Sequence, residues 1–183
     1  MTINIFGEVE HGGSFTLSAI NTAFNALVAA GGPTEIGSVR KIQLIRNGES
    51  QYLDVYGFMQ NPNLQYEFYL EDNDIIFVPI AEKVVNIQGA VKRPMHYELL
   101  DGEELMTLLD FAGGLNANAY TDFIQIRRYA SNKETLINVS LQRLLDNGED
   151  FALRNGDQVF IKRVPEAVEN LVSIEGAVEL PGN

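Results

Sequence analysis

The sequence predicts an α+β fold built from two tandem copies of one small module, each a mixed sheet with one main helix. Short segments recur in the same order at an offset of about 82 residues, and strand-like runs alternate with one helix-like run in each copy. The composition is globular, since 45% of the 183 residues are hydrophobic and 21% are charged. No window approaches the roughly 18 uninterrupted apolar residues of a membrane helix.

Five segments recur in the same order, which chance does not readily give. The matching pairs are residues 5–9 and 87–91, 29–32 and 111–114, 42–46 and 124–128, 53–55 and 137–139, and 70–78 and 153–161. Residues 174–178 repeat the first segment once more. We therefore expect a first module at 1–82, a second module at 83–165, and at 166–183 a linker with the first strand of a truncated third module.

The second copy shows the order of its elements most clearly, beginning with a hairpin. A strand at 84–87 leads through a glycine to a turn at 92–94, and a second strand returns through Tyr97 and Leu99. Pro94 suits a turn or a sheet edge because its φ is fixed and it has no N–H to donate. This pattern predicts a β-hairpin.

A helix follows the hairpin. Asp101 and Glu104 have the spacing of a capping box, and Gly113 stands where a helix end favours a left-handed residue. One apolar face is predicted in each copy; its residues are Leu105, Leu108, Leu109 and Ala112 in the second and Ala23, Ala26, Leu27 and Ala30 in the first. In the first copy, Phe24 and Val28 lie beside this face and are expected to widen it.

The remaining elements complete the sheet. Residues 123–127 and 136–139 predict strands, residues 140–145 a helical turn in the second copy, and 154–157 an Asn-Gly turn before a last strand at 158–161. The order strand, strand, helix, strand, short strand, strand is a β-grasp-like plan. About 82 residues are enough for each module to fold alone around a small core.

Charge and cysteine content exclude several classes of function. The net charge is −12, of which −7 falls in residues 1–82, −1 in 83–165 and −4 in 166–183. An acidic chain repels phosphate, so neither nucleic acid nor an anionic membrane surface is an expected partner. The absence of cysteine excludes disulfides, thiolate metal sites and a cysteine nucleophile.

The motifs together resemble the soluble-ligand-binding β-grasp (SLBB) module, which occurs in tandem in bacterial outer-membrane polysaccharide export proteins. The residues that carry the resemblance are Gly89, Val91, Pro94, Tyr97, Ala112, Gly113, Gly114, Leu115, Asn155, Gly156, Asp157 and Phe160. It covers both modules. The departures bear on whether both copies share one ligand preference, not on the fold; they are Met95 after Pro94, Gly12-Gly13 in place of Pro-Gly, Pro33 in place of Leu, and Asn73 in place of Gly.

This resemblance implies a periplasmic segment of an outer-membrane capsule or exopolysaccharide exporter, whose modules associate into a ring and contact the polymer. The full-length protein would be membrane-associated and this segment soluble. The abrupt start after Met1 and the missing polysaccharide-export domain predict a segment cut from a longer protein, with any signal peptide lost. The alternative is a discrete receptor module for a small soluble saccharide, using the glycine-bearing hairpin.

Seven residues are candidates for contact with a ligand or a neighbouring subunit: Gly7, Gly89, Lys92, Arg93, Tyr97, Arg127 and Arg128. The glycines, with Gly176, either admit a ligand or a neighbouring chain to the backbone or form a β-bulge or tight hairpin. The basic residues either bind acidic sugars or an acidic neighbour, or are solvated strand ends. The first module's aromatics, which are Tyr52, Tyr56, Phe58, Tyr66, Phe68 and Tyr69, either stack on sugar rings or fill the core.

No catalytic, cofactor or metal site is predicted. The Gly-Gly pairs at 31–32 and 113–114 follow a helix, whereas phosphate loops precede one, so they are interpreted as helix C-caps. Glu71, Asp72 and Asp74 lack the spacing of a Ca²⁺ loop and are interpreted as a solvated turn. His11 and His96 are expected in surface loops, outside any triad or metal spacing, so we expect binding and assembly, not an enzyme.

Overall fold

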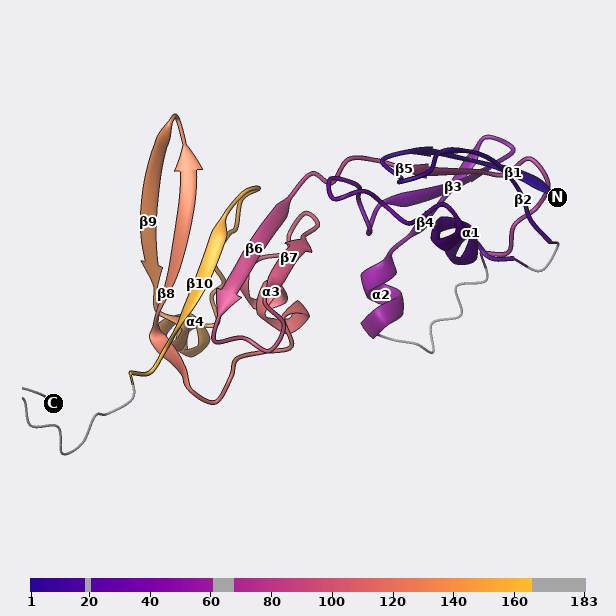
Figure 1. Cartoon of the computed structure of the whole chain (residues 1–183). Coiled ribbons are helices and arrows are strands. Elements are labelled where there is room, and N and C mark those ends of the chain that lie inside the picture. The colour runs from indigo at the N-terminus through magenta and orange to yellow at the C-terminus, as the bar shows by residue number, and fades with distance from the viewer. Residues whose placement is uncertain (19–20, 61–67, 166–183) are drawn as a thin grey trace, which may run out of the picture.

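The computed structural model describes residues 1–18, 21–60 and 68–165. These residues form two five-stranded sheets, each with its own hydrophobic core (Figure 1). The strands of one sheet lie between residues 2 and 78, and those of the other lie between residues 84 and 163. The third copy, with Gly176, and the aromatic residue Tyr66 lie outside the described residues.

The two sheets share one topology. The first has the order β2-β1-β5-β3-β4 and the second β7-β6-β10-β8-β9. In each, the first and last strands pair in parallel at the centre and the other pairs are antiparallel, which makes both sheets mixed. The strands are β1 (Thr2–Gly7), β2 (Gly13–Thr16), β3 (Ile42–Arg46), β4 (Glu49–Leu53), β5 (Ile75–Val78), β6 (Val84–Gly89), β7 (Met95–Glu98), β8 (Ala119–Ala130), β9 (Lys133–Val139) and β10 (Gln158–Arg163).

Each sheet buries one face against a helix and leaves the other open, because side chains alternate along a strand. The helices α1 (Ala23–Ala29) and α3 (Leu105–Phe111) supply the faces that the sequence predicts, and all eight predicted residues are buried. Phe24 and Val28 are 40% and 64% exposed, so the expectation that they widen the buried face of α1 was wrong.

The predicted capping box at Asp101 and Glu104 does not form. The N-cap of α3 is Glu104, whose side chain makes no capping hydrogen bond. The Asp150 carboxylate instead accepts from the Met106 N–H at 3.1 Å, from a loop distant in sequence. A cap that a remote loop supplies leaves no local signal, so the spacing rule chose the wrong residue.

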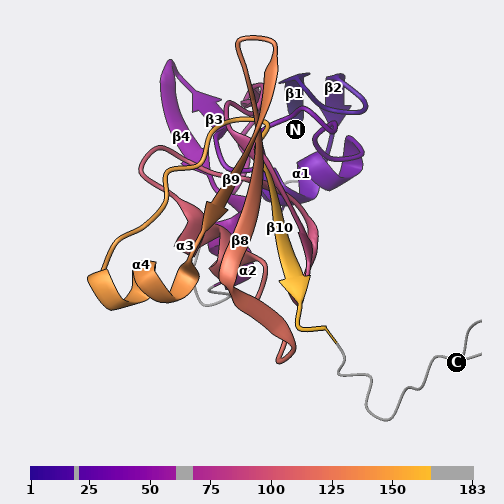
Figure 2. The same cartoon turned by 90° about the vertical axis from the view of Figure 1, so that its left-hand side faces the viewer.

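The equivalence of residues 53–55 with 137–139 is two residues out of register. Leu53 pairs with Ile42, and Val139 pairs with Ile124. Because Ile42 and Ile124 are equivalent in the two repeats, Leu53 corresponds to Val139 and not to Ile137. The longer β8–β9 hairpin of the second module, which rises beyond the rest of its sheet (Figures 1 and 2), explains the slip.

A short helix follows β4 in the first module and β9 in the second. The predicted turn at 140–145 is α4 (Leu141–Asn147), capped by the Ser140 hydroxyl, which accepts from the Arg143 N–H. The first module has an unpredicted equivalent, α2 (Val55–Gln60), where the Asp54 carboxylate accepts from the N–H groups of Tyr56 and Gly57. With the corrected register, Asp54 and Ser140 occupy the same position.

A buried ion pair is repeated in both sheets. Asp74 and Asp157 are each 1% exposed, and they bind Arg46 at 2.7 Å and Arg128 at 2.6 Å. Each carboxylate also accepts a backbone N–H from the turn that precedes the last strand. The interpretation of Asp74 as part of a solvated turn was therefore wrong, because its carboxylate ties that turn to β3.

The modules meet at a polar contact centred on Arg40. Its guanidinium binds the Asp54 carboxylate at 2.9 Å and the carboxylate of Glu103 from the second module. The buried Glu98 carboxylate, also from the second module, accepts from the Ser38 hydroxyl at 2.6 Å and the Arg40 N–H at 3.1 Å. These hydrogen bonds join the two modules through groups largely shielded from water.

An aromatic cluster extends this joint. Tyr56 on α2 packs edge-on against Phe111 and Tyr97 of the second module, at centroid distances of 5.1 and 6.2 Å. The Arg40 guanidinium lies 5.2 Å from the Tyr56 centroid and 5.0 Å from that of Phe111. The Tyr56 hydroxyl accepts from the Glu98 N–H, and burial raises the pKa of Tyr56. The joint therefore combines ion pairs, cation–π contacts and apolar packing.

Candidate functional site

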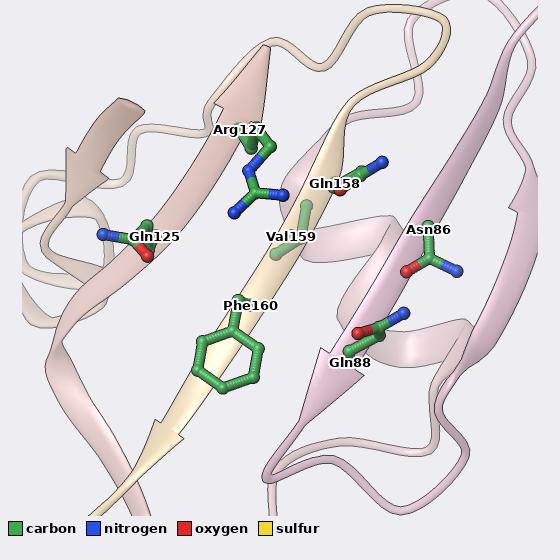
Figure 3. A pocket seen from close by; sticks show the side chains of 7 residues that line it. All are labelled: Asn86, Gln88, Gln125, Arg127, Gln158, Val159 and Phe160. Atoms are coloured by element: carbon green, nitrogen blue, oxygen red, sulfur yellow. The ribbon is translucent and has the colours of Figure 1, made fainter. Parts of the chain in front are cut away.

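The open face of the second sheet gathers polar side chains over three central strands (Figure 3). The register aligns Asn86, Gln158 and Arg127 in one row across β6, β10 and β8. A second row aligns Gln88, Phe160 and Gln125 across the same strands. These six side chains line an open hollow of about 250 Å³, which also borders Val159 of the central strand β10.

Strand alternation produces this composition. The intervening residues are buried against α3, namely Val85, Ile87, Ile124, Ile126, Val159 and Ile161. The residues between them must point to the opposite face, where four of the six carry amides. Each of the three strands therefore alternates apolar residues, which face the core, with mostly polar residues, which face the open side of the sheet.

The groups on this face suit a ligand rich in hydroxyls. Each amide offers donors and an acceptor, and Phe160, which is 43% exposed, offers a ring face to stack on an apolar surface. Arg127 supplies a planar cation that can bind a carboxylate through two hydrogen bonds. Its guanidinium lies 3.5 Å from the Glu134 carboxylate, in an exposed and therefore weak ion pair. The guanidinium thus remains available to an anionic ligand.

Both histidines were expected in loops, but only His11 lies in one. His96 lies in β7, where its Nε2 is 3.1 Å from the Asn86 side-chain nitrogen. This contact holds Asn86 at the margin of the hollow. His11 lies in the bend between β1 and β2 and is exposed.

The predicted arginine pair divides between two environments. Arg127 points to the open face, whereas Arg128 points inward, where it binds Asp157 and donates to the Ala152 carbonyl at 2.9 Å. Only Arg127 among the seven candidates belongs to the hollow. Sequence reasoning missed the four amides, although their alternation with buried aliphatic residues was a signal that could have found them.

The glycines Gly7 and Gly89 end the parallel central strands. Their φ values are +89° and +92°, and a Cβ would lie 2.0 Å from the carbonyl oxygen of Val78 or Ile161. The chain that approaches these glycines is therefore the neighbouring strand of their own sheet. Both positions require glycine for backbone conformation and for space.

The other three candidates lie around the turn of the β6–β7 hairpin, away from the open face. Tyr97 is buried and donates to the Arg93 carbonyl at 2.9 Å, while the Arg93 guanidinium donates to the Phe111 carbonyl at 2.8 Å. Lys92 is exposed. Arg93 and Tyr97 line a hollow of about 280 Å³ between the modules; its other residues are Tyr56, Met59, Met95 and Phe111.

The first module's aromatics also divide. Tyr56 belongs to the joint, Phe68 packs against the core, and Phe58 packs on Phe24 at 5.7 Å between ring centroids. Tyr52 and Tyr69 are 62% and 53% exposed. The Gly-Gly pairs follow α1 and α3 with positive φ, as helix C-caps do.

Both sheets lie in segments that match models of known protein families. Residues 2–78 match one family model described as SLBB domain, and residues 84–140 match a second model with the same description. The chain belongs to the SLBB family. Its second SLBB match ends before β10, yet β10 pairs with both β6 and β8, so this module continues to that strand.

SLBB domains are modules that bind soluble ligands such as polysaccharides, and they occur in polysaccharide export proteins. Membership of the family suggests an extracytoplasmic location. Within residues 1–18, 21–60 and 68–165, no helix is long and apolar enough to cross a membrane. In the same part of the chain, no cluster of three or more histidine or acidic side chains could hold a metal ion.

Proposed function

We propose that this chain is a periplasmic segment of an outer-membrane exporter of capsular polysaccharide or exopolysaccharide, and that the open face of its second SLBB module contacts the polymer. The observation that carries the proposal is the pair of cross-strand rows on that face. Four amides, one aromatic ring and one arginine match the hydroxyls, ring faces and carboxylates of an acidic polysaccharide.

The shape of the face favours passage over capture. The hollow is open to solvent, so a polymer can lie across it without an end being enclosed. Hydrogen bonds in contact with water contribute only about 1 kcal/mol each, which permits release as the chain advances. Edge strands β2, β4, β7 and β9 offer unpaired backbone groups through which modules of neighbouring subunits could pack into a ring.

A second candidate function is a receptor for a small saccharide. The observation that favours it is the hollow between the modules, where Arg93 and Tyr97 of the hairpin meet Tyr56 and two methionines. Sites of this kind often lie between domains. This function predicts tight binding of a mono- or disaccharide, whereas the export function predicts that affinity grows with the length of the oligomer.

Isothermal titration calorimetry with a uronic-acid hexasaccharide tests the export proposal. Arg127→Gln should weaken binding roughly tenfold, because it removes the one cation among the residues that line the hollow. Arg143→Gln is the matched control, since Arg143 is an exposed arginine on α4 outside the hollow, and it should bind like the wild type. Equal affinity of Arg127→Gln and wild type, or binding that ignores oligomer length, contradicts the proposal.

A further inference from the structure

The open face of the first module carries a row of aromatic side chains. The register aligns Phe6 on β1 with Phe77 on β5, Phe77 with Gln43 on β3, and Gln43 with Tyr52 on β4. The three rings are 49%, 36% and 62% exposed. Because paired residues in a sheet point to the same side, the row presents two rings, an amide and a third ring in a line across four strands.

The second module has a different row at the same positions. Its residues are Gln88, Phe160, Gln125 and Asn138. The phenylalanine and the glutamine at the centre of the row are thus shared by both modules. The two outer positions are aromatic in the first module and carry amides in the second, so the outer positions distinguish the two surfaces.

The first open face is also uncharged. Its outward strand positions are Thr2, Asn4, Phe6, Ser14, Thr16, Gln43, Ile45, Ser50, Tyr52, Ile75 and Phe77. Arg127 of the second module is replaced here by Ile45, and Gln158 by Ile75. The surrounding module carries a net charge of −7, so it repels an anionic ligand and offers such a ligand no cation on this face.

We infer that the row Phe6–Phe77–Gln43–Tyr52 is a stacking platform for a neutral polysaccharide that crosses the strands. Adjacent strands lie about 4.8 Å apart, so the row spans roughly 14 Å. Successive sugar units of an extended glycan can therefore each meet one member of the row. The rings pack on the apolar C–H faces of the sugars, and Gln43 donates to and accepts from their hydroxyls between the rings.

The class of ligand, a polysaccharide, rests on the proposed function, whereas the surface that binds it is a different one. The two open faces would divide the recognition of a polymer: the first takes uncharged units by stacking, and the second takes acidic units through Arg127. The two sites lie on different sheets, so variants can remove them separately.

Affinity electrophoresis in gels that contain hydroxyethylcellulose, galactomannan or alginate tests this assignment. The wild type should be retarded by at least one of the two neutral polymers. Phe6→Gln and Tyr52→Asn should each weaken that retardation roughly 2- to 10-fold, the value of one lost aromatic contact. Both changes introduce the residue that the second module holds at the same position of the sheet, so the fold should be retained, as circular dichroism can verify.

Two controls make the outcome specific. Tyr69→Asn removes an exposed ring beside the start of α1, away from the row, and should leave retardation unchanged. Arg127→Gln should weaken retardation by alginate and leave retardation by the neutral polymers intact, so failure of this inference and failure of the proposed function are distinguishable.

Three results would overturn the inference. The first is the absence of retardation in both neutral gels. The second is retardation of Phe6→Gln and Tyr52→Asn equal to that of the wild type. The third is self-association of the wild type, measured by analytical ultracentrifugation, that the same variants abolish, because the row would then be a contact between copies of this chain.

Discussion

Arg127 and Arg128 are neighbours in sequence but lie on opposite faces of β8. Arg127 is exposed over the hollow, while Arg128 is 12% exposed and neutralises a buried aspartate. At the scale of single residues, the face of the sheet on which a strand residue lies decides whether its charge is available to a ligand or stabilises the fold. The sequence predicted both arginines as candidates because residue type alone does not show which face of a strand a residue occupies. The buried Ile124 and Ile126 show that Arg128 lies on their inward face and Arg127 on the open one.

Arg128→Ala should lower the free energy of unfolding by about 3 kcal/mol, because it leaves the Asp157 carboxylate buried without its cation. Arg127→Ala, one residue away, is the matched control and should cost about 0.5 kcal/mol or less. Urea denaturation followed by circular dichroism measures both values. Equal effects of the two substitutions would show that Arg128 is not structural.

Asp74 predicts a pH dependence of stability. Burial alone would raise the pKa of Asp74, but hydrogen bonds from Arg46 and the Glu71 N–H hold it below the ordinary value of 3.8. Since the folded-state pKa is the lower one, this stability is present above pH 3.8 and is lost as the pH falls through the folded value. Arg46→Ala should raise the pKa of Asp74, so acidification should cost this variant less stability than it costs the wild type.

Urea denaturation of both proteins at about pH 7 and about pH 3 measures the difference. An equal loss of stability on acidification in both would contradict the role assigned to the Arg46–Asp74 pair.

At the scale of elements, the parallel pairing of first and last strands organises each module. Their close approach depends on Gly7 and Gly89, where a side chain would collide with the backbone of the partner strand. The strands and the helix faces could be predicted because apolar residues recur about every 2 positions in a strand and every 3.6 in a helix. The turn before β10 could be predicted from its Asn-Gly dipeptide. The cap of α3 by Asp150 could not, since its two partners lie 44 residues apart.

Gly89→Ala should destabilise the protein by roughly 3 kcal/mol or more, because the new Cβ would stand 2.0 Å from the Ile161 carbonyl oxygen. Gly114→Ala is the control: its φ of +83° is similar, but open space surrounds it, so it should cost only about 1 kcal/mol. Thermal unfolding separates the two. If both cost the same, the penalty comes from backbone conformation alone.

At the scale of the whole molecule, one asymmetric joint connects two modules of shared topology. The repeat predicted the modules, yet it could not predict the joint, because the joint uses residues that the repeat does not share. With the corrected register, Arg40 corresponds to Asp122 and Tyr56 to Gln142 in the second module. The same divergence separates the two open faces, so a shared fold carries two different surfaces.

Arg40→Ala should loosen the joint, because Asp54, Glu98 and Glu103 would then face one another without a cation. NMR relaxation should show a shorter rotational correlation time for each module than in the wild type, where the two should tumble together. Lys41→Ala, which removes an exposed pair with Glu82, should change neither module. Unchanged tumbling of Arg40→Ala would contradict a joint held by this network.

We propose that the open face of the second SLBB module contacts polysaccharide. An NMR titration of the protein with an acidic oligosaccharide at millimolar concentration tests it most directly. We predict shifts in the side-chain amide signals of Gln88, Gln125 and Gln158 and in the backbone of β6, β8 and β10. The absence of shifts, or shifts confined to Tyr97 and Phe111 between the modules, would contradict the claim.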